Sequence, residues 1–138
     1  NKRRGDEAGD LALGQVAAIL ASQSRSGDTF YRKGGEEFVG LLTDTDLRGA
    51  LLVAERLRST IASAGIPHGG HPECPHLTVS IGVASGRTAE TTVEELIVTA
   101  GHEMLRAKQR GRNQVSPRQD LHPHRGDRPI EPDDDDVA

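Results

Sequence analysis

Hydrophobic and polar positions along the first 115 residues follow the period of a helix and the period of a strand in turn. Between residues 9 and 22 the apolar positions are three and four residues apart, at Leu13, Val16, Ala17 and Leu20. This spacing predicts a helix with one apolar face, and Asp10 is placed to cap it or to lie in its first turn. The same spacing predicts two more amphipathic helices, one across 47–61 and one across 92–110.

Residues suited to helix ends flank the two later helices. Asp44 or Asp46 precedes the helix across 47–61, where a carboxylate can accept hydrogen bonds from the exposed amides of the first turn. Gly111 follows the last helix, and glycine adopts the left-handed conformation of a helix end at low cost.

Strand-like segments lie between these helices. Segments 28–33 and 36–42 flank Gly34-Gly35 and predict a hairpin. The second of them contains the apolar run FVGLL, so we expect it to be a central strand covered on both faces. Segment 76–84, HLTVSIGVA, alternates large aliphatic and small residues, as a strand with one packed face does. The order predicts an α+β sandwich, with helices packed on a largely antiparallel sheet.

Composition and charge divide the chain into two parts. Residues 116–138 hold seven acidic residues against three arginines, a net charge of −4, while residues 1–115 hold 14 of each sign. The last segment also contains four of the seven prolines. We therefore predict a single domain over 1–115 and a disordered acidic tail over 116–138. A neutral domain with an acidic tail argues against nucleic-acid binding, which depends on a basic surface.

Several absences in the sequence bear on its location. No apolar run approaches the roughly 18 residues of a membrane span, and no signal segment opens the chain. Cys74 is the single cysteine, so no disulfide can form within the chain. We expect a soluble, cytoplasmic protein with no membrane contact. Because residue 1 is Asn1 and not methionine, we also expect the chain to be a piece of a longer one.

One loop contains residues that zinc accepts as ligands. The segment HGGHPECPH places four of them within nine residues: His68, His71, Cys74 and His76. Their spacing matches no standard zinc motif, and Pro72 and Pro75 indicate a surface loop. A zinc site is the minor alternative here, and a plain loop is the main one.

Five stretches in order carry a resemblance to a known family. Segment 32–38, RKGGEEF, resembles the signature of the GGDEF family, the diguanylate cyclases, in its GGEEF spelling. The other four are NKRRGDEAGDLAL from residue 1, RSGD at 25–28, LTVSIGVA at 77–84 and AKQRGRN at 107–113. The chain is identified by these motifs as a member of the family over about residues 1–115.

The resemblance implies a fold and a reaction. Domains of this family are similar to nucleotide cyclases and polymerase palms, and they join two GTP molecules into cyclic di-GMP. Each subunit of an antiparallel homodimer holds one GTP, and two divalent cations, Mg²⁺ or Mn²⁺, bridge the phosphates.

The resemblance also assigns the residues around the glycine pair. Gly34 and Gly35 bring the backbone close to the nucleotide. Glu36 is a metal ligand and the acceptor of the hydroxyl proton, and Glu37 assists at the metal. Taken without the other motifs, the same hairpin tip could simply be a solvated turn.

Two further pairs match nucleotide-binding positions of the family. Asn1 and Asp10 match the guanine-reading positions, and Lys108 and Arg112 match the triphosphate-binding pair. Asp10 would otherwise be a helix cap. The two cations would otherwise be favoured by the C-terminal end of a helix dipole.

Arg25 and Asp28 form the RxxD pattern that binds the inhibitory product in this family, with Arg56 as a possible second contact. Guanidinium groups suit both phosphates and guanine edges. The alternative is an ion pair within the loop.

The chain departs from the family at its start. The family's first strand, which carries another metal-binding aspartate, would precede Asn1. We therefore expect a sheet lacking its first strand, a fragment that is inactive alone, and an N-terminal sensory or regulatory domain upstream. The alternative function is a catalytically inactive effector or interaction domain that binds cyclic di-GMP.

Overall fold

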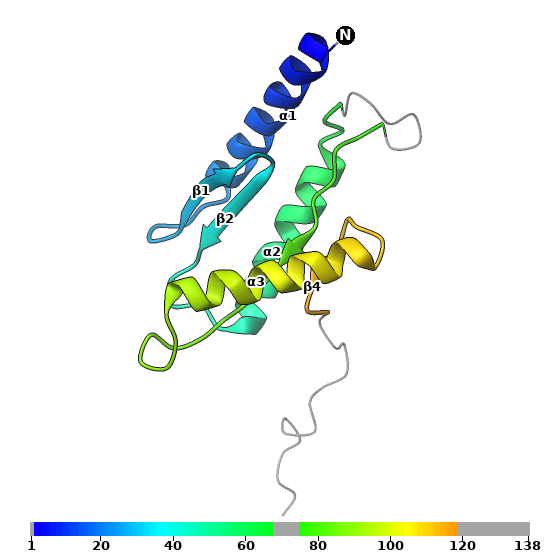
Figure 1. Cartoon of the computed structure of the whole chain (residues 1–138). Helices are drawn as coiled ribbons and strands as arrows, with labels where there is room; N and C mark the ends of the chain where they lie inside the picture. Colours follow the sequence, from blue (N-terminus) through cyan, green and yellow to red (C-terminus); the bar gives the residue numbers. More distant parts are fainter. Residues whose placement is uncertain (1, 68–74, 119–138) are drawn as a thin grey trace, which may run out of the picture.

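The computed structural model describes residues 2–67 and 75–118 of the chain. Figure 1 shows the elements within these ranges. They are, in chain order, α1 (Lys2–Ser22), β1 (Thr29–Gly34), β2 (Glu37–Leu41), α2 (Leu47–Ser63), β3 (Ile81–Gly82), α3 (Val93–Gln109) and β4 (Val115–Ser116). The predicted order of helices and strands is confirmed as far as α3, and β4 is an element that the sequence pattern did not predict.

A small aliphatic core holds α1 against α2. On α1 the buried residues lie four apart, which places them in one stripe: Ala12, Val16 and Leu20. They pack with Leu57 and Ile61 of α2, of which Ile61 is 1% exposed. The predicted apolar face of α1 is therefore only partly buried. Leu13 is half-buried and Ala17 is exposed, because this side of the helix borders a cavity.

The helix ends confirm two of the predicted caps. The Asp46 carboxylate accepts a hydrogen bond from the Gly49 amide at 2.8 Å and caps α2. Gly111 follows α3 with a φ of +120°, the left-handed conformation expected there. The prediction for Asp10 was wrong, because α1 begins at Lys2 and Asp10 lies well inside it. Its carboxylate is therefore not used as a cap.

The strands form two separate pairs in the described part of the chain. β1 and β2 make the predicted antiparallel hairpin, and its register pairs Thr29 with Leu41 and Arg32 with Phe38. β3 and β4 form a short parallel pair. Among the described residues β2 pairs with β1 alone, so the prediction of a central strand was wrong. The strand predicted across 76–84 is reduced to the two residues of β3, and His76 at its start forms only an isolated antiparallel bridge with Pro67.

The helix α3 lies directly across β3. A Cβ atom added to Gly82 would collide with the Ala100 carbonyl oxygen and the Met104 amide nitrogen of α3, and would lie 2.9 Å from the Glu103 carbonyl carbon. Only a residue without a side chain lets the two backbones approach this closely. The position of α3 over the second strand pair therefore depends on one glycine.

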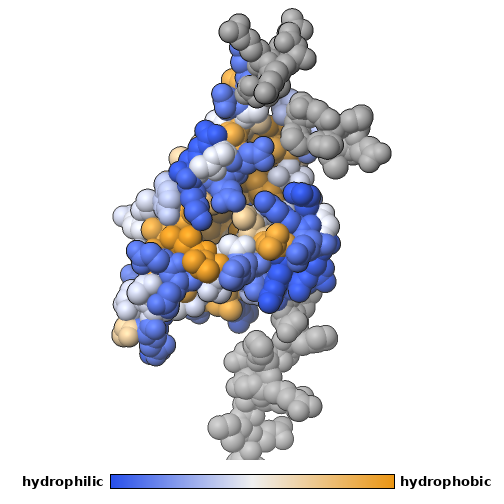
Figure 2. All heavy atoms as spheres, in the orientation of Figure 1, coloured by the Kyte–Doolittle hydropathy of each residue, from blue (hydrophilic) through white to orange (hydrophobic). Residues whose placement is uncertain are grey.

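In Figure 1 the hairpin lies beside α1, α2 stands to the right of the hairpin, and α3 crosses below them. Figure 2 shows apolar side chains around a hollow in the middle of this face. Within residues 2–67 and 75–118, no helix is both long enough and apolar enough to cross a lipid bilayer.

Candidate functional site

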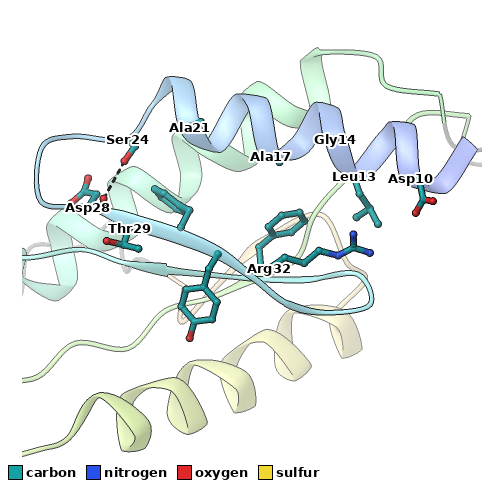
Figure 3. A pocket seen from close by; sticks show the side chains of 12 residues that line it. Asp10, Leu13, Gly14, Ala17, Ala21, Ser24, Asp28, Thr29 and Arg32 are labelled. Carbon is teal, nitrogen blue, oxygen red and sulfur yellow. Dashed lines mark hydrogen bonds between the residues drawn. The ribbon is translucent and has the colours of Figure 1, made fainter. Parts of the chain in front are cut away.

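A cavity of about 740 Å³ lies between α1 and the hairpin (Figure 3). Small and aliphatic residues of α1 form one wall, among them Leu13 and Ala17, and Phe30 and Phe38 of the hairpin line the other. Both phenylalanines also pack against the core, so the floor of the cavity is fixed by the fold. The result is a slot with mainly apolar walls.

Charged groups lie at the two ends of this slot. Figure 3 shows Asp10 on α1 at one end and Asp28, which precedes β1, at the other. The Arg32 side chain extends from β1 toward the end where Asp10 lies. The structure therefore brings two of the predicted site residues, Asp10 and Asp28, to a single cavity.

The turn of the hairpin is held by an arginine that the sequence analysis missed. Arg32 donates two hydrogen bonds to the carbonyl oxygen of Gly35, from Nε at 2.8 Å and from Nη2 at 2.6 Å. Gly35 has a φ of +53°, which favours glycine. The available signal was the position of Arg32 two residues before the glycine pair, on the strand that enters the turn.

The two glutamates follow this turn at once. Glu36 and Glu37 are exposed, and a Cβ at Gly34 or Gly35 would meet no atom within 4 Å. The space outside the turn is therefore open to a ligand. The two glycines therefore allow the backbone conformation of the turn and leave its outer side open to a ligand. They are not required to avoid a clash with other parts of the protein.

Oxygen ligands of this kind suit magnesium. Mg²⁺ is usually held by one or two carboxylates together with substrate phosphates and water. Glu36 and Glu37 fit that requirement, since they supply two exposed carboxylates on a held turn. No cluster of three or more acidic, histidine or cysteine ligands occurs within residues 2–67 and 75–118.

The segment from Arg25 to Asp28 forms a tight loop without an ion pair. The Asp28 carboxylate accepts a hydrogen bond from the Arg25 backbone amide at 3.1 Å. The Asp28 amide in turn donates to the Arg25 carbonyl at 3.0 Å. In the described part of the chain, the ion pairs are Glu55–Arg58 and Glu103–Arg106. The alternative of an ion pair between Arg25 and Asp28 was therefore wrong.

Arg56 is tied to the same end of α1. Its Nε donates to the side-chain oxygen of Gln23 at 3.3 Å, and the Gln23 amide nitrogen donates to the Thr60 hydroxyl at 2.9 Å. Gln23 lies two residues before Arg25, so this network brings Arg56 close to the predicted product site. Nothing in the sequence pattern pointed to Gln23.

The remaining predicted residues lie apart from the cavity or outside the described residues. Lys108 is half-buried near the end of α3, and Arg112 is exposed just beyond it. His76 is exposed. The rest lie outside the described residues, so the structure does not place them: Asn1, His68, His71 and Cys74.

Comparisons with known proteins identify the family of the chain. Residues 1–114 match the family described as "Diguanylate cyclase, GGDEF domain". The chain is 36% identical over 116 residues to diguanylate cyclase A of Treponema denticola and 41% identical over 115 residues to diguanylate cyclase DgcM of Escherichia coli K12. These alignments cover 84% and 83% of this chain but only 31% and 27% of the two relatives.

A solved structure supports the same assignment. The active GGEEF domain of a diguanylate cyclase from Vibrio cholerae superposes with a TM-score of 0.69 at 25% identity, covering 83% of this chain and 71% of that one. This likeness confirms the expected α+β fold of the cyclase type. On the motifs, the fold and the match over residues 1–114, the chain belongs to the GGDEF family of diguanylate cyclase domains.

Proposed function

We propose that the chain is the catalytic part of a diguanylate cyclase, which condenses two GTP molecules into cyclic di-GMP and two pyrophosphates. One observation carries the proposal. The turn that Arg32 holds by hydrogen bonds presents Glu36 and Glu37 at an open surface. The same hairpin lines one side of an apolar cavity, and the Asp10 carboxylate lies at one end of that cavity. A metal-binding edge next to a slot for a flat base is the arrangement that this reaction requires.

The slot suits a guanine base. Its apolar walls can take up the faces of a purine, and the Asp10 carboxylate can accept hydrogen bonds from the N1–H and the 2-amino group. We propose that Asn1 adds the amide that meets the O6 and N3 side of the base. Adenine presents no donor at N1, so Asp10 would favour guanine.

Glu36 and Glu37 would hold the Mg²⁺ or Mn²⁺ ions, which when bound neutralise phosphate charge and polarise the phosphoryl oxygen. The Glu36 carboxylate takes the proton from the 3′-hydroxyl of one GTP as that oxygen bonds to the α-phosphorus of the other. The bond from this phosphorus to the pyrophosphate oxygen breaks, and pyrophosphate leaves. Lys108 and Arg112 bind the departing phosphates, since ammonium and guanidinium groups both form charge-assisted hydrogen bonds with phosphate oxygens.

The reaction needs two chains. One GTP is held by each subunit of a homodimer, and the two nucleotides face each other in opposite directions, so that each 3′-hydroxyl attacks the other's α-phosphorus. We propose that an N-terminal sensory or regulatory domain in the full-length protein controls this pairing of subunits. We also propose that the reaction takes place in the cytoplasm with GTP as the substrate.

The test of the function is a product assay. The full-length protein is incubated with GTP and MgCl₂, and the nucleotides are separated by chromatography and identified by mass. We expect cyclic di-GMP and two equivalents of pyrophosphate, with a specific activity that rises with protein concentration as the dimer forms. A protein that makes no product but binds cyclic di-GMP would instead support the alternative of a catalytically inactive effector.

We further propose that Arg25, Asp28 and Arg56 form an inhibitory site for the product. The Arg25 guanidinium is not used by Asp28, which accepts from the backbone amide instead. Arg56 of α2 donates a hydrogen bond to Gln23, which holds its side chain near the same loop. Two exposed arginines near one loop can contact both phosphates and the guanine edges of cyclic di-GMP.

Arg25→Ala is expected to weaken the binding of cyclic di-GMP by about 1.5–3 kcal/mol, the range for loss of a charge-assisted contact. Isothermal calorimetry with the product measures this change. Arg87→Ala is a matched control, because Arg87 also starts a loop in which its carbonyl accepts from the amide three residues on, here Glu90 at 2.9 Å. Equal affinities for wild type and Arg25→Ala would return Arg25 to the role of an ordinary turn residue.

A further inference from the structure

The turn that follows α3 has an unusual backbone. Three successive residues have positive φ angles, +120° at Gly111, +65° at Arg112 and +47° at Asn113. Glycine adopts this conformation freely and asparagine tolerates it, but for arginine it is costly. Such a conformation persists only where surrounding contacts impose it.

A side-chain network from α2 supplies the contact. Arg58 donates from Nη1 to the Asn113 side-chain oxygen at 2.8 Å. Its other nitrogens bind the carboxylate of Glu55, with Nε at 2.9 Å from Oε2 and Nη2 at 2.6 Å from Oε1. We call the three residues Glu55, Arg58 and Asn113 the latch.

An ion pair within α2 orients the Arg58 side chain of the latch. The Arg58 side chain is 20% exposed, and its hydrogen bond lowers the pKa of the Glu55 carboxyl. Glu55 therefore stays ionised and fixes the guanidinium fork, which leaves Nη1 pointing at Asn113. The contact joins residues 55 positions apart in the sequence, so it ties the turn after α3 to a different helix.

The backbone of Arg112 is held on both sides as well. Its amide donates to the Ala107 carbonyl at 3.0 Å, and its carbonyl accepts from the Gln114 side chain at 3.2 Å. Its side chain is exposed, and within residues 2–67 and 75–118 it makes no hydrogen bond or ion pair. A rigid backbone therefore carries a guanidinium that is available to a ligand.

We propose that Arg58 is a positioning residue for the phosphate site: through Asn113 it holds the turn in the conformation that aims Arg112 at the triphosphate. This inference rests on the proposed function, in which Lys108 and Arg112 bind the phosphates of GTP. Arg58 itself does not touch the nucleotide. Its role is to remove the freedom of the turn before binding, so that less conformational entropy is lost when the phosphates arrive.

The experiment compares a triphosphate with a monophosphate on the full-length protein. Calorimetry uses the unreactive α,β-methylene analogue of GTP and, separately, GMP, which lacks the β and γ phosphates. Arg58→Ala is expected to weaken the analogue about tenfold, the scale of one poorly placed charge-assisted contact, with GMP unchanged within about twofold. Arg58→Lys, which keeps the charge but has no fork to reach both partners, is expected to show the same loss.

Arg106→Ala is the matched control. Arg106 also pairs with a glutamate three residues before it, at 2.9 Å from Glu103, and it lies on α3 near Lys108, but its side chain makes no hydrogen bond or ion pair with residues 111–113. The Arg106→Ala variant also removes one positive charge, and Arg106 is nearer than Arg58 to Lys108 and Arg112 in the sequence. Both nucleotides are therefore expected to bind this variant as they bind the wild type.

Two readouts separate positioning from general loss of stability. If Arg58 acts through Asn113, the double variant Arg58→Ala/Asn113→Ala loses no more affinity for the analogue than Asn113→Ala alone. Hydrogen exchange at the Arg112 amide is expected to quicken in Arg58→Ala and to stay unchanged in Arg106→Ala.

Three outcomes would contradict the proposed role of the latch. They are additive affinity losses in the double variant, an equal loss of affinity for GMP and the analogue in Arg58→Ala, and unchanged hydrogen exchange at the Arg112 amide in that variant. A wild-type protein that binds GMP as tightly as the triphosphate analogue would overturn the phosphate site itself. The exchange measurement still decides, in that case, whether Arg58 holds the turn.

Discussion

Glu36→Gln is expected to lower the rate of cyclic di-GMP formation by about 10²- to 10⁴-fold, the usual contribution of a positioned proton acceptor. Glutamine keeps the shape of the side chain but removes the charge that would bind the metal and the basicity that would take the hydroxyl proton. The rate is measured on the full-length protein with GTP and MgCl₂, by chromatographic quantitation of the product.

The control for this variant is Glu90→Gln, which makes the same change at another exposed glutamate in a loop. We expect it to retain wild-type turnover. The thermal midpoint of Glu36→Gln should match that of the wild type, because the side chain is exposed and lies outside the core. Wild-type turnover in Glu36→Gln would remove Glu36 from the mechanism.

Gly82→Ala is expected to lower the free energy of unfolding by about 3 kcal/mol, the upper part of the range for an overpacked site. The added Cβ meets backbone atoms of α3 at Ala100 and Met104, which cannot rotate away as a side chain can. Either α3 shifts off β3 or the strand pair opens. Urea unfolding followed by circular dichroism gives the change in free energy.

Gly101→Ala is the matched control, since it is a glycine-to-alanine change on the helix that Gly82 contacts. A Cβ at Gly101 meets no atom within 4 Å, so we expect this variant to be more stable, by about 0.5–1 kcal/mol, through helix propensity. Equal midpoints for Gly82→Ala and the wild type would mean that α3 does not dock on β3 as described.

The helices of this domain could be predicted from the sequence because their apolar positions repeat. The stripe containing Val16 and Leu20 and the cap at Asp46 required only local information. The start of α1 could not be found in this way. Residues 2–9 contain no apolar period, so the pattern began at Leu13 and placed Asp10 at a helix end that does not exist there.

Strand pairing was less accessible. The hairpin was predictable because its turn and both strands adjoin in sequence. β4 pairs with β3 across more than 30 residues, and a strand of two residues is too short to show an alternation of apolar and polar positions. The apolar run in β2 indicated burial on both faces, but pairing depends on which neighbour a strand meets, and that is decided by tertiary structure.

The candidate site divides along the same line. Motif resemblance indicated Glu36, Asp10 and Arg25 as site residues. The contacts behind two other site residues, Arg56 and Arg112, were not predicted, because Gln23 meets Arg56 across 33 positions and Arg58 meets Asn113, the neighbour of Arg112, across 55. Such contacts exist only once the helices have packed.

The helix α2 joins two of these networks within a single turn. Arg56 reaches Gln23 beside the proposed product site, and Arg58 reaches Asn113 beside the proposed phosphate site. Leu57 between them is 5% exposed and packs in the core, and the three residues lie on one turn of a single helix. If product bound at Arg56 displaced α2 along its axis, the Arg58 guanidinium would move with the helix. The turn that carries Arg112 would then shift, and the affinity of the proposed phosphate site for GTP would depend on the concentration of product.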